Sequence, residues 1–202
     1  MTLHLLFCAN TAYFQHVAVA CASLVENNPD KKIVVNLVFM DTDFNKEKML
    51  DRTISHFKHI ELRKYHVDSK DMLGFFIDSY LTIETYLRLI APRVLPSDID
   101  RVIYLDSDLV VLGNLTPLMD IDLKGCPVGA VPDYPRVPDV ISKERLMSLG
   151  IPESHTYVNA GVLVMDLEAW RREGLTRQFV EFIRARGAQL AFHDQDAINA
   201  VL

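Results

Sequence analysis

The chain has 202 residues, of which 50% are hydrophobic and 24% are charged, and its formal net charge is -6 at pH 7. This length fits one domain with a substantial core, and the composition is that of a globular protein rather than a disordered one. The acidic balance disfavours binding to nucleic acid through its phosphates. No run of apolar residues approaches the roughly 18 that are needed to cross a bilayer.

The cysteines and the N-terminus give an expectation about the compartment. Cys8, Cys21 and Cys126 are far apart and follow no C-x-x-C spacing, so we expect buried free thiols in a reducing environment. The N-terminus lacks the positively charged leader and long apolar run of a secretory signal. These features predict a cytoplasmic protein and leave open an association with the inner face of the membrane.

Strand-like and helical segments alternate along the first third of the chain. Residues 3–9, 33–40 and 60–66 predict three strands, the first two as nearly continuous apolar runs. Helices between them are indicated by apolar residues at helical spacing: Val17, Ala20, Cys21, Leu24 and Val25, then Met49, Leu50, Ile54 and Phe57. This alternation predicts an α/β domain with a mainly parallel central sheet and helices on both faces.

The rest of the chain continues the pattern. A helix that carries Ile83, Tyr86, Leu87 and Ile90 is expected to begin at a Thr82 cap and to end before Pro92. Further strands are predicted within the run 101–112 and around 127–131 and 157–167. A short helical segment is predicted after the turn 114–117, and further helices around 139–149, 179–187 and 192–202. The last helix has no polar cap after it. We therefore expect residues 1–202 to form a single catalytic domain that is shortened at its C-terminus.

Two carboxylates interrupt an apolar, β-type run that extends from Arg101 to Leu112. Because burial of an unpaired carboxylate is costly, we expect Asp106 and Asp108 where the strand emerges, with a cation between them. On extended backbone, residues i and i+2 point the same way, so both can reach one ion. Oxygen ligands without a Cys or His pair beside them predict Mn²⁺ or Mg²⁺. The alternative is a solvated turn that happens to hold two acids.

Polar residues follow several predicted strands, where ligands of open α/β sheets bind. They are Asn10, Thr11, Asp106, Asp108, Asp133, Asn159 and the cluster Asp194-Gln195-Asp196. A metal held by two carboxylates, with amides, an arginine and further acids around it, suits a diphosphate-linked substrate, because the cation would neutralise the phosphates. Ordinary roles stay open for some of these residues: a turn for Asp133, and the first turn of a helix for Asp194 and Asp196.

Four segments carry a resemblance to a known family. They are YLRL at 86–89, VIYLDSD at 102–108, YVNAGVL at 157–163 and HDQDAIN at 193–199. The chain resembles, over essentially its whole length, the family eight retaining glycosyltransferases, which include bacterial lipopolysaccharide galactosyl- and glucosyltransferases and glycogenin. The resemblance implies a GT-A fold and a Mn²⁺-dependent transfer that keeps the anomeric configuration. The implied donor is UDP-galactose or UDP-glucose, and the implied acceptor is a glycan or lipid-linked sugar.

The resemblance also implies residue roles in donor binding. Asp106 and Asp108, with Ser107 between them, match the D-x-D segment whose acids bind the metal and bridge to the diphosphate. Arg88 matches an arginine that contacts the donor sugar and phosphate region. Other donor-site positions are matched by Ala9, Asn10 and Tyr13 in the loop that holds uracil and ribose, and by Asn159 and Gly161 in the strand that lines the donor pocket.

Three residues match positions close to the reaction. Asp133 matches a carboxylate near the sugar, Asp194 an acid that holds sugar hydroxyls, and Gln195 the residue closest to the anomeric carbon. Because an amide is a poor nucleophile, departure and attack on one face of the sugar is favoured, with a covalent intermediate as the alternative.

Two departures from the family pattern affect these expectations. Ala12 stands where the family often carries Asn. The family's third metal ligand is a His in a later segment that would follow Leu202, so activity of this chain stays open, as does membrane association through such a segment. Two other functions are considered. One is a haloacid-dehalogenase-like, Mg²⁺-dependent phosphatase with Asp106 as nucleophile, although half the chain precedes that residue. The other is a domain that binds a nucleotide sugar without turning it over.

Overall fold

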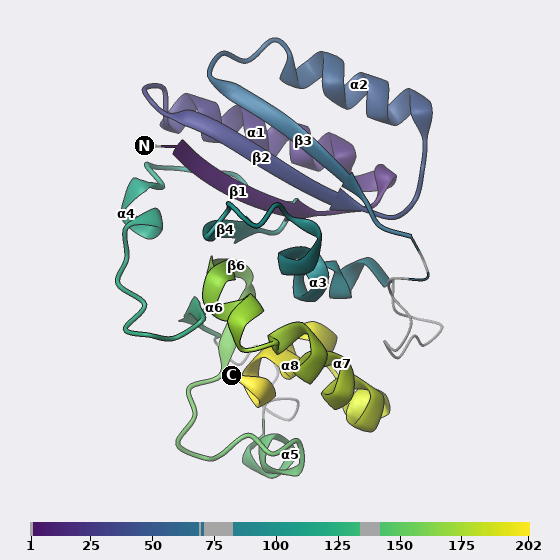
Figure 1. The fold of residues 1–202 in the computed structure, drawn as a ribbon, viewed down its shortest axis with the longest axis vertical. Coiled ribbons are helices and arrows are strands. Elements are labelled where there is room, and N and C mark those ends of the chain that lie inside the picture. Colours follow the sequence, from purple (N-terminus) through teal and green to yellow (C-terminus); the bar gives the residue numbers. More distant parts are fainter. Residues whose placement is uncertain (1, 69, 71–82, 134–141) are drawn as a thin grey trace.

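The computed structural model describes residues 2–68, 70, 83–133 and 142–202, and its centre is a six-stranded sheet (Figure 1). The strands are β1 (Thr2–Cys8), β2 (Lys32–Phe39), β3 (Ile60–His66), β4 (Arg101–Leu105), β5 (Val128–Pro132) and β6 (Val158–Asp166). Their order in the sheet is β3-β2-β1-β4-β6-β5. The first four are parallel, whereas β6 runs antiparallel to both β4 and β5. The predicted mainly parallel sheet is therefore confirmed.

Helices cover both faces of this sheet. They are α1 (Phe14–Asn27), α2 (Phe44–Ile54), α3 (Leu87–Val94), α4 (Thr116–Met119), α5 (Lys143–Ser148), α6 (Leu167–Arg172), α7 (Leu175–Arg186) and α8 (His193–Val201), with 3-10 turns η1 (Thr11–Tyr13), η3 (Ile83–Tyr86) and η4 (Gly187–Gln189). A hydrophobic core lies on each face of the sheet, and adjacent residues of a strand point into different cores because side chains alternate along a strand. Leu5 packs with α1 and α2, and Leu6 packs with α3. In Figure 1, α1 and α2 lie beside β1–β3, whereas α3, α6, α7 and α8 gather around the other half.

Most predicted elements are present, with two corrections to the predicted burial. Met49 does not belong to the buried stripe of α2, because its side chain is 69% exposed while Leu50 and Ile54 are buried. Cys126 is exposed rather than buried, although all three cysteines are free as expected. The expected positions of Thr82 and Val140 lie outside the described residues. No described helix is long and apolar enough to span a membrane.

Helix α3 continues through Pro92 instead of ending before it. A proline in a helix removes one hydrogen bond to the preceding turn and normally destabilises the helix. The side chain of Arg171, from α6, stabilises the C-terminal end of this helix instead. Its guanidinium donates to the carbonyl oxygens of Pro92 at 2.7 Å and of Ile99 at 3.0 Å, and it also reaches those of Leu95 and Pro96. These bonds satisfy carbonyl groups that the end of a helix leaves unpaired.

The central acidic segment leaves the sheet earlier than an extended strand would. Strand β4 ends at Leu105, and Ser107 and Asp108 form a turn. The expectation that the acids lie where the strand emerges is confirmed, but the reasoning from extended backbone at Asp106 and Asp108 was wrong. A turn, not the pleat, sets the relative directions of the two carboxylates. Beyond it, Ser23 and Asn27 of α1 hold the backbone of Val111 through hydrogen bonds of 2.9 Å.

Candidate active site

Two adjoining pockets lie at the edge of the sheet where β1 and β4 end. The first, of about 310 Å³, is lined by seven predicted site residues: Ala9, Asn10, Tyr13, Arg88, Asp106, Ser107 and Asp108. The second, of about 250 Å³, is lined by six: Arg88, Asp106, Asn159, Gly161, Asp194 and Gln195. Arg88 and Asp106 belong to both pockets. The structure thus brings together every predicted site residue except Asp133, which lies behind Gln195.

Strand direction explains how Asn159 reaches this edge. Because β6 is antiparallel to β4, the beginning of β6 lies beside the end of β4, where Leu105 pairs with Val162. The backbone N–H of Asp106 then donates to the carbonyl of Gly161 at 2.8 Å. Asn159 therefore lies within strand β6. From the sequence, it had been grouped with residues that follow strands. Its side-chain oxygen accepts from the N–H of Gly161 at 2.8 Å.

The loop after β1 is fixed by side chains from two directions. Oδ1 of Asn10 accepts from the backbone N–H groups of Ala12 at 3.1 Å and Tyr13 at 3.3 Å, so it caps the turn η1. Asp41, after β2, accepts from the backbone N–H of Thr11 at 2.9 Å and from its hydroxyl at 2.6 Å. This role of Asp41 was not predicted, because in the sequence Asp41 looks like a turn residue after the second strand. Tyr13 remains 45% exposed at the mouth of the first pocket.

Arg88 is the electrostatic centre of the two pockets. Its Nη1 donates to the carbonyl of Ala160 at 2.7 Å, its Nη2 lies 3.2 Å from Oδ1 of Asp106, and its Nε lies 2.9 Å from Oδ2 of Asp194. Its guanidinium carbon also lies 4.3 Å from the ring centre of Tyr104. Burial opposes the charge, but Asp194, Tyr104 and Asp106 together hold the pKa of Arg88 above its ordinary value. Arg88 is thus not an ordinary surface arginine.

The two acids of the turn leave carboxylate oxygens free for a cation. Oδ1 of Asp106 accepts from the hydroxyl of Tyr104 at 2.7 Å, whereas Oδ2 has no hydrogen-bond partner among the described residues. A Cβ atom at Gly161 would lie 2.8 Å from Oδ2, so the glycine leaves space there. Asp108 is exposed and also has no partner in the described part of the chain. Free, hard oxygen donors of this kind fit Mg²⁺ or Mn²⁺.

A third protein ligand is not found beside this pair. Among the described residues, no group of three or more His, Cys, Asp or Glu side chains is placed to hold a metal ion. Water and substrate oxygens can supply further ligands to a cation at Asp106 and Asp108. The arrangement suits a cation that binds together with an anionic substrate.

Helix α8 supplies two of the residues around the second pocket. Oε1 of Gln195 accepts from the backbone N–H of Ala160 at 3.0 Å, and its Nε2 donates to Oδ2 of Asp133 at 2.9 Å. Asp194 is buried, and burial raises the pKa of its carboxyl to about 6 although the charge of Arg88 acts in the opposite direction. The pocket therefore presents a buried acid beside an amide whose orientation is fixed.

Asp196 is not part of the site, although it belongs to the same polar cluster of the sequence. It is fully buried and pairs with Arg145 of α5, with Nη1 3.2 Å from Oδ1. It also accepts from the hydroxyl of Tyr157 at 2.6 Å and from the backbone N–H of Ala191 at 2.8 Å. Residues two apart on a helix are rotated by about 200° and face nearly opposite sides. Asp194 therefore faces the pocket while Asp196 anchors the helix.

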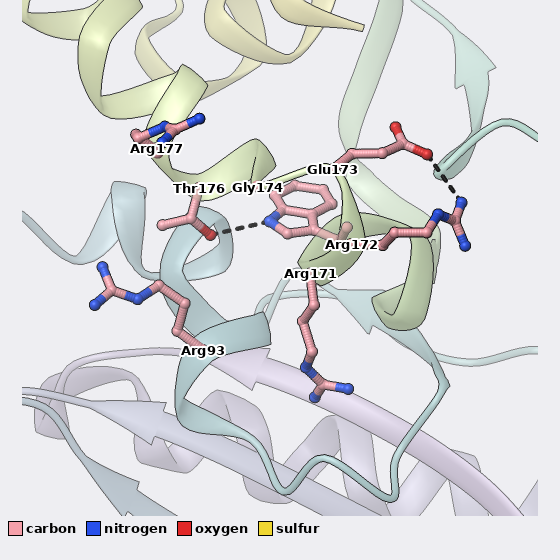
Figure 2. Close-up of a pocket in the computed structure, with 8 residues that line it drawn as sticks. Arg93, Arg171, Arg172, Glu173, Gly174, Thr176 and Arg177 are labelled. Carbon is pink, nitrogen blue, oxygen red and sulfur yellow. Dashed lines mark hydrogen bonds and ion pairs between the residues drawn. The ribbon is translucent and has the colours of Figure 1, made fainter.

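Another hollow, of about 380 Å³, is lined by several arginines but lacks the features of a binding site. Figure 2 shows that its arginines point in different directions, with Arg172 turned toward Glu173. Arg172 lies 3.0 Å from a carboxylate oxygen of Glu173, and Arg171 is occupied by the carbonyl groups at the end of α3. These guanidinium groups do not converge on one point, so the pockets at the strand ends remain the candidate site.

Comparisons with known proteins identify the family and the fold. Residues 4–202 match the model of the family described as Glycosyl transferase family 8. General stress protein A of Bacillus subtilis is 30% identical, and the alignment covers 99% of this chain and 69% of that protein. A lipopolysaccharide 1,2-glucosyltransferase of Escherichia coli is 26% identical over 90% of this chain and 53% of its own length. The chain thus spans between about half and two thirds of these relatives.

Solved structures show the same architecture. The galactosyltransferase LgtC, crystallised with donor and acceptor sugar analogues, superposes with a TM-score of 0.85 and 26% identity, covering 98% of this chain and 70% of that one. The fold is therefore the GT-A fold of glycosyltransferases, and the phosphatase alternative finds no support. Both the family match and the fold extend over nearly all of the sequence, and the chain belongs to glycosyl transferase family 8.

Proposed function

We propose that residues 1–202 form one catalytic domain that transfers a hexose, galactose or glucose, from UDP to a glycan or lipid-linked sugar of the lipopolysaccharide type, with retention of configuration. The observation that carries this proposal is the position of Arg88, which joins Asp106 in the first pocket to Asp194 in the second. A diphosphate at this junction would place the nucleotide in one pocket and the sugar in the other. The relatives named above support the transfer of a sugar.

The first pocket has the features that a nucleotide diphosphate needs. Tyr13 offers an exposed ring for contact with the base, and the side-chain nitrogen of Asn10 has no partner among the described residues. Asp106 and Asp108 would hold Mn²⁺ or Mg²⁺. Such a cation neutralises the diphosphate and stabilises its charge as the sugar leaves.

The second pocket would hold the sugar through groups that accept hydrogen bonds from hydroxyls. Asp194 and Asn159 line it, and Gln195 lies between them and Asp133. The bond between the anomeric carbon and the diphosphate oxygen breaks, and an acceptor hydroxyl forms the new bond on the same face while its proton passes to the departing diphosphate. Gln195 is neutral and hydrogen-bonded at both ends of its amide, which supports this one-face route over a covalent intermediate.

The first experiment is calorimetric titration of UDP into the chain with and without Mn²⁺. We expect binding that requires Mn²⁺ in the wild type and is lost in the double variant Asp106→Asn/Asp108→Asn. A matched control is Asp120→Asn/Asp122→Asn, because these acids have the same spacing and are exposed elsewhere on the surface. Binding that is independent of Mn²⁺, or equally reduced by both double variants, would contradict the proposed donor site.

A second candidate function is binding of a nucleotide sugar without turnover. The lack of a third acidic, histidine or cysteine ligand among the described residues favours it. Release of UDP from UDP-galactose or UDP-glucose in the presence of Mn²⁺ separates the two functions. Turnover that is lost in Gln195→Ala, while UDP still binds, supports the transferase; binding without release by the wild type supports the second candidate.

We propose that the protein acts in the cytoplasm, and experiment must decide whether it associates with the inner face of the membrane. Cys8 and Cys21 are free thiols, and burial raises the pKa of both, as suits structural cysteines in a reducing compartment. Fractionation of cells that produce the protein, followed by immunoblotting of soluble and membrane fractions, tests this expectation.

A further inference from the structure

The two carboxylate oxygens of Asp106 have different surroundings. Oδ1 is 2.7 Å from the hydroxyl of Tyr104, which donates to it, and 3.2 Å from Nη2 of Arg88. Oδ2 receives no hydrogen bond from the described residues and lies in the space that the missing side chain of Gly161 leaves open. One oxygen is therefore held by the protein and the other remains available.

Tyr104 is placed to hold that oxygen firmly. It lies on β4, its side chain is buried with only 1% exposed, and its ring stacks against the guanidinium of Arg88. Because the ring is fixed by the core and by Arg88, the hydroxyl has little freedom of its own. An ordered donor at this position limits rotation of the Asp106 carboxylate.

Arg88 pairs with only one oxygen of Asp106. A guanidinium has a planar fork of donors and tends to take both oxygens of a carboxylate. Here Arg88 reaches only Oδ1, because its Nε pairs with Asp194 and its Nη1 with the carbonyl of Ala160. If the hydroxyl were absent, a single contact of 3.2 Å from Nη2 of Arg88 would remain on Oδ1, and the carboxylate of Asp106 would be freer to rotate.

We propose that Tyr104 is a positioning residue that fixes Asp106 with Oδ1 toward the protein and Oδ2 toward a divalent cation. This inference rests on the proposed function, since it assumes that Asp106 binds the cation. Hydrogen-bond partners of metal-ligating carboxylates typically change metal affinity by 10- to 100-fold when they are removed. Tyr104 would thus tune cation affinity without touching the cation.

The test variant is Tyr104→Phe, which removes the hydroxyl and keeps the ring against Arg88. A matched control is Tyr157→Phe, because Tyr157 is also buried and donates to an aspartate, Asp196, at 2.6 Å. Binding of Mn²⁺ in the presence of UDP is measured from the electron paramagnetic resonance signal of free Mn²⁺. Thermal unfolding of each variant measures the structural cost of losing a buried hydroxyl.

We expect Tyr104→Phe to raise the Kd for Mn²⁺ by about 10-fold and Tyr157→Phe to leave it within about twofold, with both variants folded. An unchanged or tighter Kd in Tyr104→Phe, while the wild type binds Mn²⁺, overturns the role of Tyr104 alone. An equal rise in both variants also overturns it, because the effect would then be structural. Absence of UDP-dependent Mn²⁺ binding in the wild type overturns the proposed donor site and the role of Tyr104 together.

Discussion

Gln195 donates a hydrogen bond of 2.9 Å from its Nε2 to Oδ2 of Asp133, across 62 positions of the chain. A carboxylate oxygen can only accept, so Asp133 determines which end of the amide faces it. The oxygen end of Gln195 then meets the backbone N–H of Ala160. The amide orientation next to the second pocket is therefore set by a residue that does not line that pocket.

The first prediction concerns this pair. Asp133→Ala removes one of the two hydrogen bonds that hold the amide of Gln195, and we expect kcat to fall by about 10- to 100-fold, as small misplacements at a reacting centre do. Binding of UDP with Mn²⁺ should stay within about twofold of the wild type, because Asp133 lies outside the nucleotide pocket. UDP-release kinetics and UDP titration measure the two effects. A variant with normal kcat would show that the orientation of the amide does not matter.

A second prediction concerns the space beside Asp106. In Gly161→Ala, the new Cβ atom would lie 2.8 Å from Oδ2 of Asp106 and 3.0 Å from Oδ1 of Asn159, so one of these side chains must move. Overpacking of this kind costs about 1–3 kcal/mol. We expect UDP binding with Mn²⁺ to weaken about 10-fold, since 1.4 kcal/mol corresponds to a factor of 10. The control Gly113→Ala meets no atom within 4 Å and should bind as the wild type does.

The pH dependence of stability gives a third prediction. Burial raises the pKa of the Asp194 carboxyl from 3.8 to about 6, so the folded state holds this proton more tightly than the unfolded state does. The contribution of this group to stability is then fully present below about pH 4 and is lost as the pH rises through about 6. The unfolding free energy of the wild type relative to Asp194→Asn should therefore fall by about 2 kcal/mol between about pH 4 and pH 7.5.

Urea denaturation of both proteins at several pH values, without metal or nucleotide, measures this difference. Asp194→Asn serves as the reference for the wild type, because all other titrating groups are common to the two proteins. A difference that stays constant across this range would mean that Asp194 titrates normally in the folded chain. A difference that grows with pH would mean that Arg88 outweighs burial.

The fourth prediction concerns the buried pair of Arg145 and Asp196. Arg145→Met leaves a fully buried carboxylate without its cation, and breaking a buried pair in this way typically costs 3–5 kcal/mol. The hydroxyl of Tyr157 and two backbone N–H groups still contact Asp196, so we expect about 3 kcal/mol in urea denaturation. The control Arg172→Met breaks an exposed pair with Glu173 and should cost at most about 1 kcal/mol. Equal losses in both variants would contradict this role for burial.

Much of the fold could be predicted from the sequence because the strands are continuous apolar runs and the helices carry regular apolar stripes. The direction of β6 could not, since an apolar run has the same composition in either orientation. The helix was predicted to stop before Pro92 but ends at Val94, where Arg171, distant in the sequence, binds carbonyl groups at its end. Met49 was placed in the core because helical spacing does not reveal how wide the covered face is.

The candidate site could be predicted only in part from the sequence. The family resemblance named the residues that line the two pockets, but not the residues that hold them. Tyr104 lies in the apolar run of β4 and reads as a core residue, and Asp41 reads as part of a turn. Their roles depend on contacts between separate segments, which no local pattern records. Asp194 and Asp196 look equivalent in the sequence and are separated only by the rotation of α8.

The contacts of Arg88 have a consequence for the order of folding. Its guanidinium joins residues 106, 160 and 194, so this cluster is complete only after β4, β6 and α8 have all docked. Contacts between segments so far apart in sequence form late, because closing long loops loses chain entropy before the contacts form. Recovery of UDP release from a UDP-sugar during refolding, which needs both pockets, would therefore report the docking of α8 rather than the formation of the sheet.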